Sequence, residues 1–152
     1  MDDKDRIHSV LQACVDMVIS TADKEGTPWV TPVSYVFDDK NCLYWVSSKD
    51  SRHSLNIKER KEIAIVIYMY EPRRDAIYIE AEAEELSDKA AIEEAIKVRS
   101  LRPQPKQFEI KSIDEVTGAY PWRIYKATPK SIYVRESIII KNQPVTIRRK
   151  IT

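Results

Sequence analysis

Glycine is scarce in this chain, with only two among 152 residues. Phosphate loops of the Walker type and the dinucleotide turn of Rossmann folds each need several glycines at fixed spacing. Both folds are therefore close to excluded. The cysteines also number only two, and no close Cys or His spacing indicates zinc or a redox pair. We expect Cys14 and Cys42 to be reduced structural thiols.

A long hydrophobic segment and an excess of one charge are missing as well. No apolar run approaches the roughly 20 residues that span a bilayer, and Asp2, Asp3 and Asp5 stand where a secretory signal would carry Lys or Arg. The 25 Lys and Arg nearly balance the 24 Asp and Glu, so no global field favours nucleic acid or an acidic membrane surface. We therefore expect a cytoplasmic protein without nucleic-acid or membrane partners, in which any anion site is local.

The hydrophobic content of 43% is enough for one domain with its own core over residues 1–152. The pattern predicts a mainly β (α+β) fold. Strands are expected at 18–22, 29–37, 43–47, 63–70, 77–86, 122–127, 131–135, 138–141 and 145–149. Helices are expected at 4–15, 51–60 and 88–101, with Pro103 and Pro105 ending the third. A loop over 102–118, with room for a second short helix, is expected to follow. Short connections between the first five strands favour an antiparallel barrel over a sandwich.

Three of these elements have informative patterns. In 4–15, apolar residues at helical spacing, Cys14 and Val15 among them, predict a helix that covers the sheet. The β-branched run at 63–70 is typical of a strand buried on both faces. In 77–86, apolar residues alternate with Tyr and Glu, so one face should be core and the other solvated.

The segment 47–53 collects anion-binding groups between the end of a strand and the start of a helix. A phosphate monoester carries about two negative charges at neutral pH and binds best to Arg, hydroxyls and free N–H groups at a helix N-terminus. The segment offers Ser47, Ser48, Lys49, Ser51, Arg52 and His53. Spacing alone leaves two interpretations open, a phosphate site and an ordinary polar loop capped by Ser51.

An ordered set of motifs extends the phosphate interpretation from about residue 15 to residue 87. The set is Gly26-Thr27-Pro28, Val30-Thr31-Pro32-Val33-Ser34-Tyr35, Leu43-Tyr44-Trp45-Val46-Ser47, Ser51-Arg52-His53 and Ile63-Ala64-Ile65-Val66. This order resembles the flavin-binding split barrel of the pyridoxamine 5'-phosphate oxidase superfamily. The resemblance implies an FMN-binding homodimer, with the flavin between subunits, that acts as an oxidoreductase on an unidentified small-molecule substrate.

The resemblance also implies which residues bind the cofactor. The strand Thr31, Pro32, Val33 and Ser34 is expected to pass along the flavin ring. The phosphate is expected to contact Val46, Ser47, Ser51, Arg52 and His53. Trp122 is expected either to stack near the flavin of a partner subunit, or to close the barrel end or pack at a subunit interface without a ligand. The helix around Lys97, Arg99 and Arg102 should shape the substrate pocket, and no residue is assigned a catalytic role.

Several positions depart from the family pattern. His53 stands where the family has Lys, and because an adjacent phosphate favours protonated histidine, phosphate affinity should rise as the pH falls. Enzymes that oxidise pyridoxamine phosphate resemble one another in carrying an Arg and a Lys where this chain has Thr31 and Val36. They also share a C-terminal Arg-x-His, for which the nearest string here is Arg123-Ile124-Tyr125. The departures argue against that particular oxidase activity.

Two alternatives keep the fold and change the function. Relatives of the superfamily bind deazaflavin or haem, and haem is disfavoured because only His8 and His53 are available as axial histidines. Deazaflavin is the runner-up cofactor. The other alternative is a non-catalytic flavin-binding or dimerisation module. No metal site is expected, since His8 has no second ligand at i+4.

Overall fold

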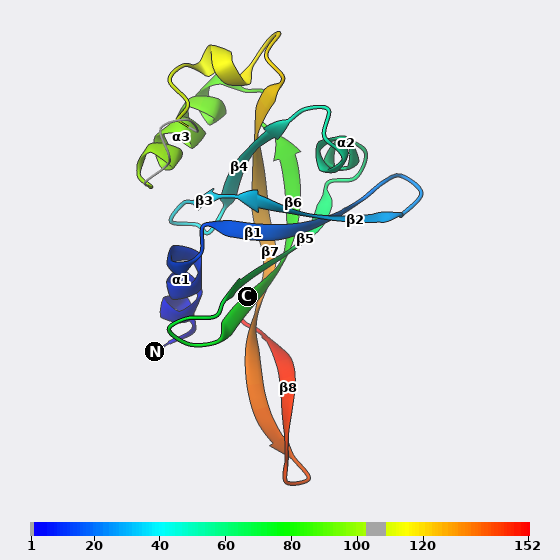
Figure 1. Cartoon of the computed structure of the whole chain (residues 1–152), viewed down its shortest axis with the longest axis vertical. Coiled ribbons are helices and arrows are strands. Elements are labelled where there is room, and N and C mark those ends of the chain that lie inside the picture. Colours follow the sequence, from blue (N-terminus) through cyan, green and yellow to red (C-terminus); the bar gives the residue numbers. More distant parts are fainter. Residues whose placement is uncertain (1, 103–108) are drawn as a thin grey trace.

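The computed structural model describes residues 2–102 and 109–152, which form one eight-stranded sheet with helices around it (Figure 1). The helices are α1 (Asp3–Ala13), α2 (Arg52–Glu59) and α3 (Lys89–Ser100), and η2 (Ile113–Val116) is a 3-10 helix. The strands are β1 (Asp16–Ala22), β2 (Pro28–Ser34), β3 (Val36–Phe37), β4 (Leu43–Ser48), β5 (Glu62–Met69), β6 (Asp75–Glu85), β7 (Trp122–Ile140) and β8 (Gln143–Lys150). The predicted mainly β, α+β architecture is confirmed.

A single residue closes the barrel. The strand order is β2-β1-β5-β6-β7-β4-β3, with β8 paired to β7, and every pairing is antiparallel. The strands β2 and β3 stand at opposite ends of this order, yet only Tyr35 separates them in the chain. The prediction of one strand over 29–37 was therefore wrong, because the chain leaves one sheet edge and joins the other at Tyr35. Its hydroxyl donates to the Leu11 carbonyl (2.9 Å), which holds this junction against α1.

The barrel interior is filled by alternating residues of the strands. β6 shows the predicted alternation, with Ile77, Ile79, Ala81 and Ala83 buried. In β5, burial also alternates along the strand, so the prediction of burial on both faces was wrong. The apolar outer residues of β5 instead belong to a groove described below. At the core, Trp45 and Tyr125 stack with ring centroids 5.6 Å apart.

The three strands predicted between 122 and 141 are one long strand, β7. Pro129 suggests a break there, since proline lacks the N–H that a sheet requires. The structure accommodates it at a β-bulge, because Pro129 pairs with Ala81 and Ser131 pairs with the preceding Glu80. Beyond the barrel, β7 continues into a hairpin with β8, which projects from the body (Figure 1).

The helices begin at side-chain caps and end close to the predicted positions. Asp2, Ser51 and Asp88 are the N-caps of α1, α2 and α3. α1 ends at Ala13, so Val15 is 68% exposed rather than part of the covering face. The short helix expected within 102–118 is η2, while Pro103 and Pro105, expected to end α3, lie outside the described residues. Within the described part of the chain, no helix is long and apolar enough to cross a membrane.

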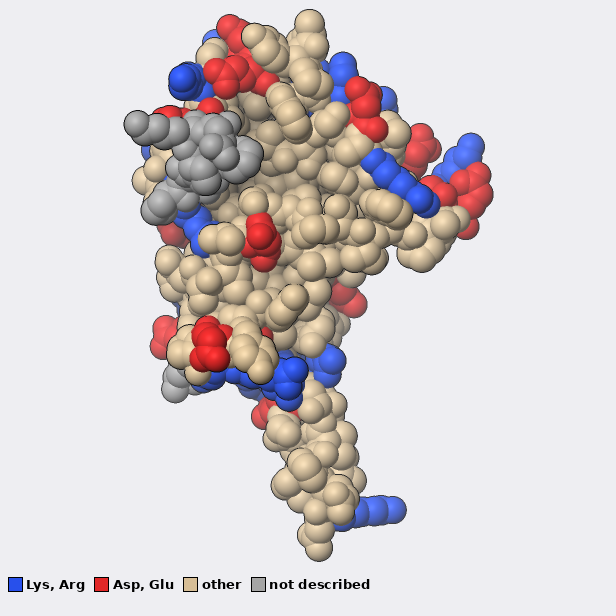
Figure 2. Space-filling model, in the orientation of Figure 1, with Lys and Arg blue, Asp and Glu red and all other residues tan. Residues whose placement is uncertain are grey.

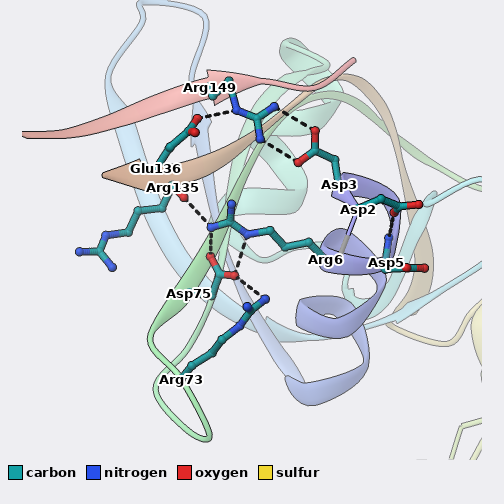
Figure 3. A network of polar contacts seen from close by, with 9 residues as sticks. All are labelled: Asp2, Asp3, Asp5, Arg6, Arg73, Asp75, Arg135, Glu136 and Arg149. Carbon is teal, nitrogen blue, oxygen red and sulfur yellow. Dashed lines mark hydrogen bonds and ion pairs between the residues drawn. The ribbon is translucent and has the colours of Figure 1, made fainter. Parts of the chain in front are cut away.

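Ion pairs fasten α1 to the sheet and to the base of the hairpin (Figure 3). The Arg6 guanidinium makes two hydrogen bonds to Asp75, of 2.8 and 2.6 Å, and a third to the carbonyl of Arg135. Arg149 of β8 pairs with Asp3 of α1 and with Glu136 of β7. These contacts join the N-terminal helix to the last strand at the base of the hairpin.

Candidate functional site

A pocket of about 630 Å³ opens between β2, β4, the start of α2 and the segment around η2. Eight of the ten predicted cofactor-binding residues line it: Pro32, Val33, Ser34, Val46, Ser47, Ser51, His53 and Trp122. The rest of its wall consists of Ser48, Arg99, Glu109, Ile110, Glu115 and Val116. Residues from five separate parts of the chain therefore meet around one cavity of the size of ordinary cofactor sites.

The hydroxyl-rich end of the pocket lies where β4 turns into α2. Ser51 is the N-cap of α2, and its Oγ accepts a hydrogen bond from the Ser54 N–H (3.4 Å). The same hydroxyl lies 2.9 Å from the Ser48 carbonyl, to which it donates. The turn is thus fixed by the hydroxyl predicted to cap the helix, and the first N–H groups of α2 lie beside the cavity.

His53 links the strand end to the helix start. Its Nε2 lies 2.8 Å from Ser47 Oγ and 3.2 Å from Ser51 Oγ. The imidazole is buried, and burial lowers its pKa from the usual value. The imidazole is therefore mainly neutral at pH 7, and a negative charge placed beside it would favour the protonated form.

Two predicted residues, Thr31 and Arg52, do not line the cavity. The Thr31 hydroxyl contacts the carbonyl of Pro32 (3.4 Å). The Arg52 side chain is exposed, and its Cζ lies 4.4 Å from the centroid of the Trp29 ring. Arg52 therefore lies next to the hydroxyl-rich end, with its guanidinium on the Trp29 ring.

The far wall contains both an expected residue and several that the sequence analysis missed. Arg99, the pocket residue expected on α3, is 8% exposed, and burial lowers its pKa. Glu115 and Val116 of η2 were not anticipated. The string Ser112-Ile113-Asp114-Glu115 has capping-box spacing and would have indicated the helix start, since Ser112 Oγ accepts from the Asp114 N–H (3.2 Å).

The family model described as pyridoxamine 5'-phosphate oxidase matches residues 3–119. The chain belongs to this family. The match covers every strand of the pocket except β7 and includes the turn between β4 and α2. Comparison with curated protein sequences gave no significant match.

Solved structures share the fold of this family member. A putative pyridoxamine 5'-phosphate oxidase of Listeria innocua is 15% identical, with a TM-score of 0.68 over 93% of this chain and 100% of that one. The heme storage protein HutZ of Vibrio cholerae is 17% identical, with a TM-score of 0.68 over 88% and 95% of the two chains. A putative 5-nitroimidazole antibiotic resistance protein of Bacteroides thetaiotaomicron is 15% identical, with a TM-score of 0.66 over 87% and 82%. At such identities the likeness shows the split-barrel fold alone.

In this member of the family, Arg123 is engaged away from the pocket. Its guanidinium donates to the carbonyls of Gly118, Tyr120 and Trp122 and pairs with Glu85 at 3.1 Å. These bonds fix the turn before β7. The turn holds Trp122 beside the pocket, with half of its surface exposed.

A second hollow, of about 580 Å³, lies on the outer face of the sheet. It is lined mainly by apolar side chains, including those of Val18, Val30 and Val66. Arg148 of β8 lies over the Tyr78 ring, 4.5 Å from its centroid, at one side of this groove. Because Val30 of the groove and Pro32 of the pocket are on the same strand, the two hollows adjoin along β2.

Proposed function

We propose that the protein binds FMN and acts as a flavin-dependent oxidoreductase on a small molecule other than pyridoxamine phosphate. One observation supports the proposal most strongly. The hydroxyls of Ser47 and Ser51, the imidazole of His53 and the N-terminus of α2 meet at one end of a cavity that the predicted ring-binding strand also lines. That arrangement suits a ligand with a phosphate at one end and a planar ring at the other.

The ring-binding strand has backbone groups available for a ligand. β2 ends the strand order and pairs with β1 alone among the described strands. Its second edge therefore offers N–H and C=O groups, and Pro32, Val33 and Ser34 of this strand line the cavity. A bound flavin supplies the electron-transfer chemistry, while the protein holds and orients it. In this chain the β2 edge orients the ring, and the turn between β4 and α2 binds the phosphate.

Pyridoxamine phosphate is a poor candidate substrate. Thr31 and Val36 replace the Arg and Lys expected for such an oxidase, and Val36 is fully buried in the core. Arg123 is engaged by the turn and by Glu85, and Tyr125 is 1% exposed. The cationic groups expected to bind that substrate are thus missing or otherwise occupied.

The other cofactors are distinguished by chemistry. The neighbour HutZ is named for heme storage, but the sequence has only two histidines. His53 Nε2 already contacts two serine hydroxyls, and His8 on α1 contacts Gln12 (3.3 Å). Because both histidines have these contacts, neither side chain is positioned as an axial haem ligand, which favours flavin over haem. Deazaflavin offers a similar ring and a phosphate group, so it stays the alternative cofactor.

The functional unit that we propose is a homodimer with the flavin at the subunit interface. The apolar groove on the outer sheet face adjoins the pocket along β2, so a second copy seated on the groove would also border the flavin. The projecting hairpin offers more apolar surface, with Ile138, Ile140, Val145 and Ile147 on one face by pairing register. Figure 2 shows this hairpin as mostly uncharged. A two-stranded hairpin is only marginally stable in water by itself, which favours cover by the second copy.

Cofactor retention tests the proposal. The purified protein is mixed separately with FMN, deazaflavin and haem, excess ligand is removed by gel filtration, and the absorbance spectrum is recorded. We expect the flavin bands to co-elute with the protein at one FMN per subunit. Ser47→Ala should lower that occupancy, whereas Lys58→Ala, at the exposed end of α2, should not. Protein that stays colourless with FMN, or that retains haem instead, would overturn the proposal.

A further inference from the structure

We infer that His53 is a positioning residue that acts through the Ser47 hydroxyl and makes phosphate binding depend on its own protonation. The inference rests on the proposed function, since the phosphate is that of the bound flavin. His53 is the residue at the start of α2 whose ring nitrogen has hydrogen bonds to two other residues of the proposed phosphate site.

Protonation of His53 fixes the direction of these hydrogen bonds. The Ser51 hydroxyl donates to the Ser48 carbonyl at 2.9 Å and also lies 2.8 Å from Ser54 Oγ, so its contact with His53 Nε2 at 3.2 Å does not fix the tautomer of the neutral ring. In the protonated imidazole both ring nitrogens carry a proton and donate. Nε2 of protonated His53 then donates to Ser47 Oγ, at the shorter distance of 2.8 Å.

The Ser47 hydroxyl is consequently free to donate into the pocket. Because Ser47 Oγ accepts from His53, its own proton has no other role in this cluster and is available to a ligand oxygen. A phosphate oxygen is such an acceptor. The chain of donors runs from His53 Nε2 to Ser47 Oγ and on to the phosphate. A lysine in place of His53 would instead present a fixed point charge.

Protonation of His53 adds a conditional charge to this chain. Burial lowers the pKa of the imidazole, so the residue is mainly neutral at pH 7. A phosphate next to Ser47 places negative charge close to the ring and raises that pKa. Binding then takes up a proton, so the affinity for FMN is highest below the pKa of the free state and falls as the pH rises from there through the pKa of the bound state.

Other charged groups surround the imidazole. Arg99 of α3, together with Glu109 and Glu115, lines the same cavity, and Lys49 and Arg52 flank the turn. Behind α2, Glu85 of β6 contacts the hydroxyl of Tyr125 of β7. Variants at position 53 leave all of these groups unchanged. The FMN phosphate itself has a second pKa near 6, but deprotonation strengthens its binding as the pH rises, which is the opposite sign.

Flavin titrations at several pH values separate the protonation of His53 from the deprotonation of the FMN phosphate. The dissociation constants of FMN and of riboflavin, which lacks the phosphate, are measured by flavin fluorescence between about pH 5 and 8, where histidine titrates. For the unmodified protein we expect the FMN constant to weaken by about tenfold or more between about pH 6 and 8, as a pKa displaced by one or more units requires. Riboflavin binding should not change over that range.

Two variants at position 53 are matched to the inference. His53→Lys keeps a permanent charge, so only the phosphate titration should remain and its affinity should rise with pH. His53→Gln supplies an N–H without a titratable group and should bind FMN with the affinity that the unmodified protein shows near pH 8. Equal pH profiles for His53→Gln and the unmodified protein would overturn the inference.

Ser47→Ala provides a test that keeps the buried histidine in place and removes its partner hydroxyl. Removal of one oxygen interrupts the donor chain, so the fall in FMN affinity between about pH 6 and 8 should shrink to less than half of that of the unmodified protein. An unchanged pH profile in a folded Ser47→Ala variant would overturn the inference even where the variants at position 53 fail to fold. Absence of FMN binding by the unmodified protein at every pH would instead contradict the proposed function.

Discussion

The Arg52 guanidinium stacks on the indole of Trp29, with Cζ 4.4 Å from the ring centroid. An exposed contact of this type is worth about 0.5–1 kcal/mol. A hydrogen bond from a guanidinium to a phosphate is worth about 1.5–3 kcal/mol. Because the hydrogen bond is the stronger of the two interactions, we expect the Arg52 guanidinium to leave Trp29 and bind a phosphate that occupies the adjoining pocket.

Arg52→Ala should therefore weaken FMN binding by about 10- to 100-fold, the equivalent of the lost charged hydrogen bonds. Trp29→Leu removes the competing surface and should leave the dissociation constant equal or lower it by up to about fivefold. Both constants can be measured by flavin fluorescence titration. Arg60→Ala is the control, since Arg60 is the exposed C-cap at the opposite end of α2. An Arg52→Ala variant with unchanged affinity would remove Arg52 from the phosphate site.

Asp75 should contribute stability that depends on pH. Burial by itself raises the pKa of this carboxyl, but hydrogen bonds from Arg6 and from the Ala76 N–H outweigh it, and the net pKa lies below the usual value. A depressed pKa stabilises the fold at pH values above the unfolded-state pKa of about 3.9 and loses this contribution as the pH falls further.

Asp75→Asn should accordingly lower the free energy of unfolding by about 3 kcal/mol at pH 7, because Arg6 loses a buried partner. The difference from the unmodified protein should shrink as the pH falls below about 4. Urea unfolding followed by tryptophan fluorescence at several pH values measures both quantities. Asp39→Asn, in an exposed turn, is the control. A difference that stays constant down to about pH 2 would contradict the assigned linkage.

Arg102 connects the end of α3 to the residue that closes the barrel. Its guanidinium donates to the carbonyls of Tyr35, Leu11, Gln12 and Cys14, at 3.0 to 3.3 Å. It also lies over the Tyr35 ring, 5.3 Å from the centroid. One side chain thus satisfies carbonyls at the end of α1 and at the junction of β2 and β3.

Arg102→Ala should cost about 2 kcal/mol, because several carbonyls lose a charged donor. For a chain of this length the melting temperature should fall by roughly 4 to 8 °C. Arg102→Lys should recover only part of the loss, since one ammonium cannot reach all four carbonyls. Differential scanning calorimetry measures the shifts, with Lys97→Ala on the exposed side of α3 as the control. Equal melting temperatures for the Ala variant and the unmodified protein would contradict this role.

The local patterns predicted most of the fold, and the errors have physical causes. Alternation in β6 and the caps at Ser51 and Asp88 depend on neighbouring residues, so the sequence displays them directly. The change of sheet edge at Tyr35 depends on contacts with α1 that are distant in the chain. The prediction of separate strands at 122–127 and 131–135 was wrong because a bulge formed with β6 accommodates Pro129 within one strand. Pairing partners are the information that local patterns lack.

In the candidate site, too, the contiguous segment was predicted and the contacts between distant segments were not. The hydroxyl-rich turn between β4 and α2 is contiguous in sequence, and its residues do meet at the cavity. By contrast, Glu109 and Glu115 arrive from a segment with weak periodicity, and only the fold brings them to the pocket wall. The resting position of Arg52 on Trp29 depends on an aromatic residue 23 positions earlier in the printed sequence. Such a contact has no local signature.

Dimerisation can be tested on the groove without disturbing the barrel interior. Val66 lies on the outer face of β5, and Arg148 lines the same groove. Val66→Lys therefore places an unpaired charge in the proposed interface next to another cation, and burial of an unpaired charge opposes association. We expect the unmodified protein to have the mass of two chains by size-exclusion chromatography with light scattering, and Val66→Lys to have the mass of one. The variant should also lose FMN, because the proposed flavin site includes both subunits.

Val66→Ile keeps the apolar surface and should remain dimeric. A monomeric unmodified protein, or a Val66→Lys variant that stays dimeric, would contradict the proposed interface.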